Sequence, residues 1–497
     1  DNILLKYNLK WTEKINWANV VNIKDFKGND WNERFDNAQK FLSQTGGGVI
    51  YFPAGIYKFN ESIYLQDGIV FRGEEPEIIK DARDERYKLD TKFDFPQYTF
   101  KQEENGTPIN TAFKGIYLFN PSKDSNCGVI NIEINHGHIY FGEDENHNAG
   151  KNRIVYGCVL KNCAVANKIV PTEWQKKWQR YTDGFRAAIH VYTEENALIA
   201  NNRIPESGED NFIMKGYVIE NPKGEKIEVD LIFDYDNRPG IYVNHYGIGG
   251  AGTTPPRGTP ELYPHGFRKG IVITQNYIFC TGRTAIGFTG DGTICSYNLI
   301  RFKPEVLRWT TASGTKMATG SSTNDNRAVE MRGWRYTVEG NDYLVYRNKI
   351  PNTRYYFNDG EGLMHEAHCN STVLNSKIMN NKGNAYISIY FTGGVNGLII
   401  KENEIRTSGG ISAIYVVSNQ YRGKKDGKKI WEKFECKNVH IINNITSGSG
   451  ITLAGEPSEN NVIKGNKHIG EQKGQILLGT KAVVEDNENY EIIYEEF

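Results

Sequence analysis

The 497-residue sequence lacks the features that would assign it to several common classes of protein. It has no run of roughly 18 apolar residues, so we expect no membrane-spanning helix. Its 59 basic and 60 acidic residues nearly cancel, which gives no argument for nucleic acid or an anionic membrane as partner. Its 7 cysteines are odd in number and show no CxxC spacing, which argues against a disulfide framework. Buried free thiols are the expectation.

What the sequence does contain is a recurring pattern of short strands. An apolar alternation precedes an asparagine and an aliphatic residue, as in IVITQNYI at 271–278 and LIIKENEI at 398–405. Many of the marked polar positions lie 21 to 28 residues apart, and they are Asn276, Asn298, Asn348, Ser376, Asn403, Asn443, Asn466 and Asn487. A period of this size is typical of a solenoid protein.

Each copy alternates over a few residues and no long helical stretch separates the copies, so the repeating unit is an all-β coil. Strands of successive coils should pair in parallel about 4.8 Å apart, with inward aliphatic side chains filling the tube. We expect the asparagine to lie at a turn, where it adopts left-handed dihedral angles and its amide bonds the same amide one coil away.

The first 80 residues form a lead-in and a capping segment. One helical face is predicted at Trp31, Phe35, Ala38 and Leu42, with Asp30 as N-cap and Glu33 completing a capping box. The sequence GGGVIYFPAGIY at 46–57 follows, and then a short strand that ends in RG at 72–73.

This order of strand, amphipathic helix and glycine-rich strand resembles the N-terminal cap of the pectate-lyase-like superfamily. The resemblance implies a single-stranded, right-handed parallel β-helix, the fold of polysaccharide hydrolases, polysaccharide lyases and phage tailspikes. The helix should plug the open end of the tube. The asparagine and aspartate arrangement of polygalacturonases and the Arg-x-Pro-x-x-Arg stretch of classical pectate lyases are absent, so the resemblance predicts a fold and not a reaction.

We expect a single domain over 1–497, with the coils in 81–490. Long insertions are expected near 168–186, 205–267, 302–326 and 419–435. Loops of a solenoid tend to cluster on its binding face. Because a parallel β-helix has no internal pocket, a ligand should lie along an outer sheet between such loops, and that shape suits a polymer.

Strand alternation predicts which side chains face this groove. With Ile189 and Val191 inward, His190 and Tyr192 point outward, and Glu330 and Arg332 do so on a later strand. A phase that places Gly362 and Met364 inward leaves Asp359, Glu361, Leu363 and His365 outward, and the next coil adds Ser388 and Tyr390.

We therefore predict catalytic roles for Glu330, Asp359, Glu361 and His365, and substrate-binding roles for His190, Tyr192, Arg332 and Tyr390. The alternatives are a solvated turn at 358–360, packing roles for the two histidines, and a salt bridge from Arg332 to Glu330 or Glu361. His365 and His368 lack the spacing and the helix of a zinc motif, so no metal site is predicted.

Carboxyl groups stacked on adjacent strands repel one another, so one keeps its proton and another loses it, as glycoside cleavage requires. The leading prediction is a glycoside hydrolase that needs no cofactor and acts on a polysaccharide or oligosaccharide. The alternatives are a polysaccharide lyase that eliminates at a uronate, with Ca²⁺ on Asp359 and Glu361, and a non-catalytic carbohydrate-binding or tailspike-like protein. The start at Asp1 hints at a removed leader, and we expect a secreted, periplasmic or cell-surface bacterial protein.

Overall fold

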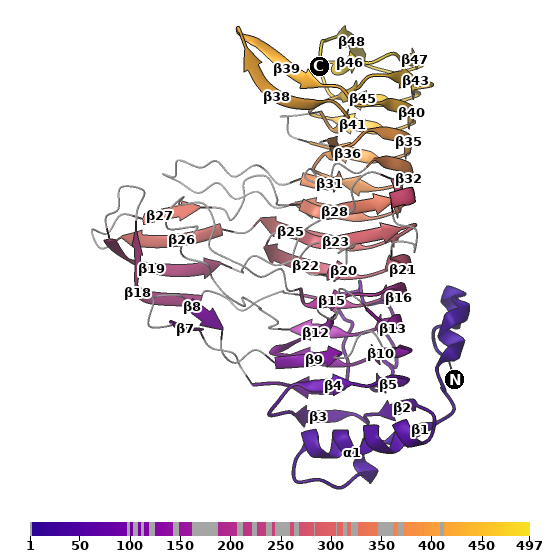
Figure 1. Ribbon diagram of the computed structural model, residues 1–497, viewed down its shortest axis with the longest axis vertical. Helices are drawn as coiled ribbons and strands as arrows, with labels where there is room; N and C mark the ends of the chain where they lie inside the picture. The colour runs from indigo at the N-terminus through magenta and orange to yellow at the C-terminus, as the bar shows by residue number, and fades with distance from the viewer. Residues whose placement is uncertain are drawn as a thin grey trace.

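The computed structural model shows a right-handed parallel β-helix with a helix at its N-terminal end, so the predicted fold class is confirmed (Figure 1). The structure describes residues 2–96, 100–102, 108–110, 114–118, 125–142, 149–161, 187–205, 212–220, 226–234, 241–243, 259–262, 268–282, 284–304, 306–311, 316–319, 327–345, 361–365, 372–390, 392–407 and 412–497.

Each coil places its strands in three parallel stacks, which we number in the order in which the chain visits them. Stack 1 contains β1 (Val20–Asn22), β2 (Gly48–Tyr51), β5 (Ile69–Arg72), β10 (Cys127–Ile130), β13 (Lys151–Tyr156), β16 (Glu195–Ala200), β21 (Lys269–Thr274), β24 (Ile294–Ser296), β29 (Thr337–Glu339), β32 (Val373–Met379), β35 (Val395–Lys401), β40 (Cys436–Ile442), β43 (Ser458–Glu459), β44 (Val462–Lys464) and β47 (Val483–Glu485).

Stack 2 contains β3 (Gly55–Lys58), β6 (Thr91–Asp94), β11 (Glu133–Asn135), β14 (Val159–Lys161), β17 (Arg203–Ile204), β22 (Tyr277–Gly282), β25 (Leu299–Pro304), β30 (Asp342–Val345), β33 (Lys382–Gly383), β36 (Glu404–Arg406), β41 (Ile445–Ser447) and β45 (Lys467–Ile469). Stack 3 contains β4 (Ile63–Leu65), β9 (Lys114–Leu118), β12 (Gly137–Phe141), β15 (Ile189–Val191), β20 (Ile241–Val243), β23 (Thr284–Asp291), β28 (Arg327–Trp334), β31 (Glu361–His365), β34 (Ile387–Tyr390), β37 (Ile414–Val417), β42 (Ile451–Ala454), β46 (Gly474–Gly479) and β48 (Tyr490–Tyr494).

The helix α1 (Trp31–Gln44) covers the first coil (Figure 1). The predicted cap is present, because Asp30 Oδ1 accepts from the backbone N–H of Glu33 at 2.8 Å, and the Glu33 carboxylate accepts from Asn29 N–H at 2.6 Å. The buried face of the helix places Phe35 against Phe71 of β5, with ring centroids 4.6 Å apart. The helix therefore closes the apolar interior at this end. Short 3-10 helices occur at Leu5–Tyr7, Lys10–Lys14, Ile23–Asp25 and Pro260–Leu262.

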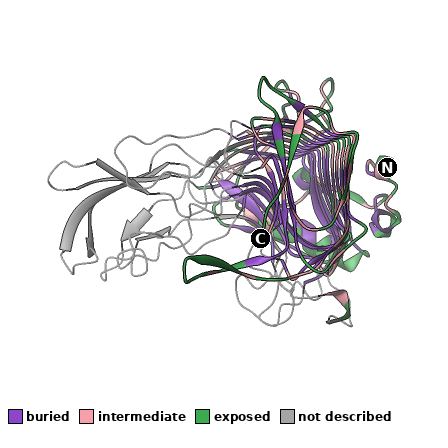
Figure 2. Cartoon of the chain, turned by 90° about the horizontal axis from the view of Figure 1, so that it is seen from above, coloured by how far each residue is buried: buried purple, intermediate pink, exposed green. Residues whose placement is uncertain are grey.

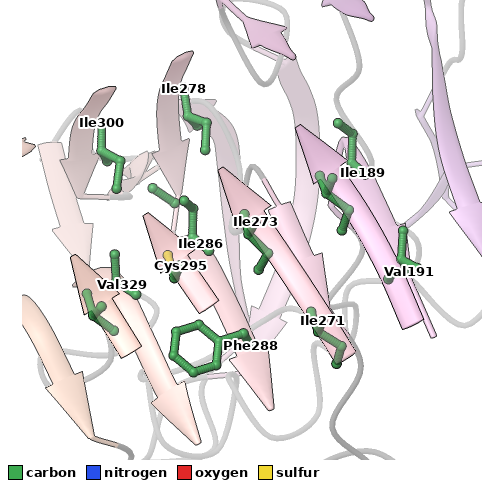
Figure 3. Packing of buried hydrophobic residues seen from close by; sticks show 14 of the residues in the cluster. Ile189, Val191, Ile271, Ile273, Ile278, Ile286, Phe288, Cys295, Ile300 and Val329 are labelled. Atoms are coloured by element: carbon green, nitrogen blue, oxygen red, sulfur yellow. The ribbon is translucent and has the colours of Figure 1, made fainter. Parts of the chain in front are cut away.

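Aliphatic side chains from all three stacks fill the interior of the coils (Figure 2). Figure 3 shows part of this core, in which Ile273 comes from stack 1, Ile278 from stack 2, and Ile189 and Val329 from stack 3. The described cysteines Cys127, Cys158, Cys295 and Cys436 are buried thiols, as predicted for them.

An asparagine ladder runs along the turns between stacks 1 and 2. Each amide Nδ2–H donates to Oδ1 of the next asparagine at 2.9 to 3.0 Å, and that Oδ1 also accepts from the backbone N–H of the previous one. The members are Asn202, Asn276, Asn298, Asn341, Asn381, Asn403, Asn444, Asn466 and Asn487. The ladder satisfies buried polar groups that water cannot reach.

The predicted ladder is confirmed in kind, but two of its marked positions were wrong. Asn381 takes the place assigned to Ser376, and Asn444 takes the place assigned to Asn443. The left-handed dihedral angles belong to the residue before each ladder position, such as Asn443 with φ 55°. Two consecutive residues therefore divide the two tasks that the sequence analysis gave to one. Asn348 lies outside the described residues.

The insertions occur at the two corners of the coil that flank stack 3. From β10 onward each connection from stack 1 to stack 2 has two residues, such as 275–276. The connections into and out of stack 3 include 162–188, 205–240, 244–268, 305–326 and 346–360. The expected insertion at 205–267 thus contains a coil strand, β20, and the coils begin before residue 81 with β2 to β5.

Three antiparallel elements belong to these insertions. β18 (Phe212–Glu220), β19 (Lys226–Asp234), β26 (Val306–Thr311) and β27 (Lys316–Thr319) form a sheet in which segments from two different coils pair. β7 (Phe100–Gln102) pairs with β8 (Pro108–Asn110), and the predicted insertion at 419–435 is a hairpin of β38 (Gln420–Lys425) and β39 (Lys428–Glu432). The predicted insertion at 168–186 lies outside the described residues.

Candidate functional site

The outer face of stack 3 is the candidate site, because it lies between the two corners that carry the long insertions. Its strands place alternate side chains inside and outside the coil. The outward positions on β12, β15, β23, β28, β34 and β37 include several polar and aromatic residues that are nevertheless nearly buried. Such side chains away from the core need specific partners, and those partners define the site.

An aromatic group occupies the part of this face formed by β12 and β15. Ile189 and Val191 are in the core, so the predicted outward orientation of His190 and Tyr192 is confirmed. Their rings are stacked with centroids 4.6 Å apart. Tyr140 of β12, in register with His190, packs against it edge to face at 5.1 Å. Together they form an aromatic surface next to the chain's first long insertions.

Tyr140 and its neighbour His138 were not identified from the sequence. They alternate with the core residue Ile139, and the His138 and Tyr140 rings lie 5.9 Å apart. The same alternation rule that found His190 would have found them. The strand at 137–141 was not assigned in the sequence analysis, so the rule was not applied there.

An ionic cluster occupies β28. Val329 and Met331 are in the core, so the predicted outward orientation of Glu330 and Arg332 is confirmed, and Arg332 forms a salt bridge with Glu330 Oε1. Arg327 Nη1 lies 3.0 Å from Glu330 Oε2, which also accepts from Thr284 Oγ1 at 3.3 Å. The cluster combines two guanidinium groups with one carboxylate.

The cluster is nearly closed to solvent. Arg327, Glu330 and Arg332 are 0%, 4% and 8% exposed. At such burial the attraction between charges is stronger than at the surface, and removal of one partner leaves an uncompensated charge. Sequence reasoning missed Arg327, because it has the inward phase of Val329 and Met331. Its long side chain nevertheless reaches the carboxylate of Glu330.

The predicted phase of β31 was wrong. Leu363 pairs with the core residue Val329, and His365 with the core residue Met331, so Leu363 and His365 point inward and Met364 lies opposite Glu330. His365 is fully buried, and its Nδ1 lies 3.2 Å from the hydroxyl of Tyr336. A slip of one residue in the alignment moves every side chain to the other face, and the neighbouring insertions hid the register.

The predicted stacking of acids takes a different form. Glu361 has Arg327 as its register partner, three residues along the strand from the position opposite Glu330. The two glutamates are on adjacent strands of stack 3, but they are not register partners. The Glu361 side chain and the whole of Asp359 lie outside the described residues.

Ser388, Tyr390 and Tyr415 continue the face beyond β31. Ile387 and Ile389 are in the core, so Ser388 and Tyr390 point outward as predicted. Ser388 is in register with Tyr415 of β37, and the Tyr390 and Tyr415 rings lie 6.1 Å apart, edge to face. Tyr415 was missed, although the alternation at 414–417 would have identified it.

In the part of the chain that the structure describes, no three His, Cys, Asp or Glu side chains come together as a metal site would require. Within the same part, every helix is too short or too polar to span a membrane.

No protein-family model matches the chain, and neither does the sequence of any curated protein. Several solved structures align with it over most of its length. They include a PL6 alginate lyase (11% identity, TM-score 0.46, 97% of this chain and 86% of the other) and a surface adhesin of Streptococcus pneumoniae (11%, 0.44, 96% and 92%). A GH87 alpha-1,3-glucanase of Streptomyces thermodiastaticus aligns at 10% identity and TM-score 0.43, over 95% and 69%. At TM-scores below 0.5, the fold assignment rests on the strand register itself.

Proposed function

We propose that this protein is a polysaccharide-degrading enzyme whose substrate lies along the outer face of stack 3. The observation that carries the proposal is the buried cluster of Glu330, Arg327 and Arg332 on the face that the insertions flank. Buried charged groups that do not belong to the core are expensive to maintain, and they are concentrated at functional sites.

The length of the face suits a polymer. The strands β15, β20, β23, β28, β31, β34 and β37 are successive neighbours. Six steps of about 4.8 Å separate His190 from Tyr415, or about 29 Å, which is the length of several sugar units. Aromatic residues occur at both ends: Tyr192 is buried against His190, and the half-buried rings of Tyr390 and Tyr415 can offer apolar surface to the faces of sugar rings. Because such polymers are extracellular, we propose a secreted or cell-surface location.

Glycoside hydrolysis is the proposed reaction. It requires two carboxyl groups, one as acid and one as base or nucleophile. Both oxygens of Glu330 already accept from guanidinium groups, which suits an ionised base or nucleophile better than a proton donor. Asp359 is then the proposed acid, because the register of β31 gives Glu361 the same inward phase as Leu363 and His365. His190, Tyr192, Arg332 and Tyr390 are the proposed substrate contacts.

The two arginines favour a second candidate reaction, β-elimination on a uronate polymer. Elimination requires that a cation neutralise the uronate carboxylate before the neighbouring proton is removed. Arg327 and Arg332 carry guanidinium groups, which can pair with carboxylates through two parallel hydrogen bonds. In this reaction Ca²⁺ on Asp359 and Glu361 would supply further neutralisation.

One assay separates the candidates. The protein is incubated with neutral and uronate polysaccharides, with and without a chelator, and both reducing ends and the far-ultraviolet absorbance of unsaturated uronates are measured. Reducing ends without absorbance support hydrolysis, and absorbance that a chelator abolishes supports elimination. Glu330→Gln should remove either activity, and Glu404→Gln, which alters a half-buried glutamate paired with Arg406 on stack 2, should not. If polymers bind but are never cleaved, the enzymatic proposal fails and a binding protein remains.

A further inference from the structure

A second feature of stack 3 lies beyond Tyr390, toward the C-terminal end. It is a cavity of about 450 Å³, open to solvent, and its wall includes Tyr415, Thr452, Lys473, Gln475, Leu477 and Glu495. A volume of this size falls within the range of small-molecule sites. Of its lining residues, Tyr415 has been given a role above as an aromatic ring at the end of the face.

The floor of the cavity is a column of outward residues. Tyr415 of β37, Thr452 of β42 and Leu477 of β46 are register partners on successive strands. They alternate with Val416, Leu453 and Leu478, which are in the core. The floor is therefore held by the same parallel pairing that holds Glu330.

The walls of the cavity come from the same two corners that flank the ionic cluster. Ser412 and Lys473 precede their stack 3 strands, at the corner between stacks 2 and 3. On the opposite side is Phe497, whose ring lies 5.8 Å from Trp431 of the β38–β39 hairpin. The cavity is thus a continuation of the face between the corners and not an isolated depression.

The lining chemistry matches a sugar without charge. Hydroxyl and amide groups that can both donate and accept come from Ser412, Thr452 and Gln475, and Ser412 Oγ lies 2.6 Å from Thr452 Oγ1. Leu477 and Phe497 offer apolar surface to the C–H groups of a sugar ring. The formal charges of the lining residues Lys473 and Glu495 cancel.

Tyr415 adds a hydrogen-bond donor. Burial, and then the negative charge of Glu495, raise the pKa of Tyr415. The phenol therefore keeps its proton in neutral and mildly alkaline solution. It can donate to a sugar hydroxyl from the floor of the cavity.

We propose that this cavity is a subsite for a neutral sugar unit of the same polysaccharide chain. β37 and β46 are three and five strands beyond β28, so the cavity lies about 14 to 24 Å from Glu330 at about 4.8 Å per strand. The substrate then carries neutral units at this distance from the reacting bond. Only the identity of the chain rests on the proposed function, since the sugar site itself stands on its own geometry.

The test uses the full chain and defined tetrasaccharides. Binding of maltotetraose, cellotetraose, xylotetraose and tetragalacturonate is measured by calorimetry and by saturation-transfer NMR. At least one neutral tetrasaccharide should bind, and Gln475→Ala or Tyr415→Phe should each weaken it roughly three- to tenfold, the loss of one hydrogen bond. Gln44→Ala, an exposed glutamine at the end of α1, should leave binding unchanged. Gln475→Ala and Tyr415→Phe each change a side chain at the surface of the cavity and keep the strand backbone intact.

Each outcome decides the proposal. If no neutral tetrasaccharide binds, if only the acidic one binds, or if binding ignores both cavity variants, the subsite is wrong. If the protein is an active enzyme, Gln475→Ala should raise the KM for long chains and leave kcat unchanged. The KM for short substrates should also stay unchanged. Loss of cleavage in every assay, together with Gln475-dependent binding of a neutral sugar, would overturn the proposed enzyme and keep the subsite. If the protein cleaves polysaccharide and neither cavity variant changes binding or KM, the proposed enzyme stands and the subsite is wrong.

Discussion

Arg327 Nη1 lies 3.0 Å from Glu330 Oε2, although strand alternation gives the two residues opposite orientations. Strand alternation directs Arg327 toward the interior, but its side chain turns toward the outer face and reaches the carboxylate. Arg332 contacts the other carboxylate oxygen, so both oxygens of Glu330 have a guanidinium partner. The position of this acid is therefore set by two cations that a stability experiment can address.

Glu330→Gln should destabilise the protein, because it removes the negative charge that two nearly buried guanidinium groups contact. We expect a loss of about 3 kcal/mol or more in the free energy of unfolding, measured by urea denaturation. The control Glu404→Gln breaks an exposed pair with Arg406 and should cost at most about 1 kcal/mol. Equal losses in the two variants would contradict the description of the cluster as a buried network.

Asn298→Ala should be among the most destabilising single changes in the ladder. Asn298 Oδ1 accepts from the backbone N–H and the Nδ2 of Asn276 at 3.0 and 2.9 Å, and all three groups are buried. Unsatisfied buried donors cost about 1 to 3 kcal/mol each, so we expect a loss of about 2 to 4 kcal/mol in urea denaturation. Asn37→Ala removes an exposed amide on α1 and should change stability by less than about 0.5 kcal/mol.

The two tasks at each turn should separate in adjacent variants. Asn443 has φ 55° and an exposed side chain, so Asn443→Gly should be nearly neutral, whereas Asn443→Ala should cost about 1 to 2 kcal/mol. Asn444→Gly removes a buried ladder member and should cost more than either. Thermal and urea unfolding of the three variants check the order. A costly Asn443→Gly beside a harmless Asn444→Gly would reverse the assignment.

Alkaline solution should weaken the fold through its thiols. Burial raises the pKa of Cys158, Cys295 and Cys436 to about 12, whereas a thiol in the unfolded chain titrates near 8.5. Above about pH 8.5 the unfolded chain therefore holds fewer protons than the folded one, and stability falls as the pH rises. Each thiol contributes about 1.4 kcal/mol per pH unit until the folded pKa is reached.

Urea denaturation at several values between about pH 8.5 and 10 measures this slope, below the range in which tyrosines dominate. Cys295→Ala should reduce the slope by one thiol's share, whatever its effect on stability at neutral pH. An unchanged slope in that variant would show that Cys295 does not carry a raised pKa.

The fold followed from the sequence because short-range patterns determine it. Alternation of apolar residues, the spaced asparagines and the capped helix at 31–44 each depend on neighbours within a few residues. The ladder was assigned to Asn443 and not Asn444 because both are asparagines, and composition alone does not tell the left-handed position from the hydrogen-bonding one.

The site was harder to predict because it depends on register between coils. His190, Tyr192, Glu330 and Arg332 were placed correctly, since a core residue precedes each of them directly along the chain. His365 was misplaced, because its strand of five residues lies between insertions on both sides and offers no anchor for its phase. Arg327 was missed for another reason. Strand alternation places it inward, but its side chain is long enough to reach the outward Glu330.

The two-residue turns between stacks 1 and 2 have a consequence for how such a molecule can change. Their ladder ties every coil to the next from Asn202 to Asn487, on the side away from the insertions. Segments at the other two corners can therefore be lengthened, shortened or exchanged while the asparagine ladder keeps the coils in register. New glycan preferences can arise in this scaffold by replacing its walls and leaving its backbone ladder untouched.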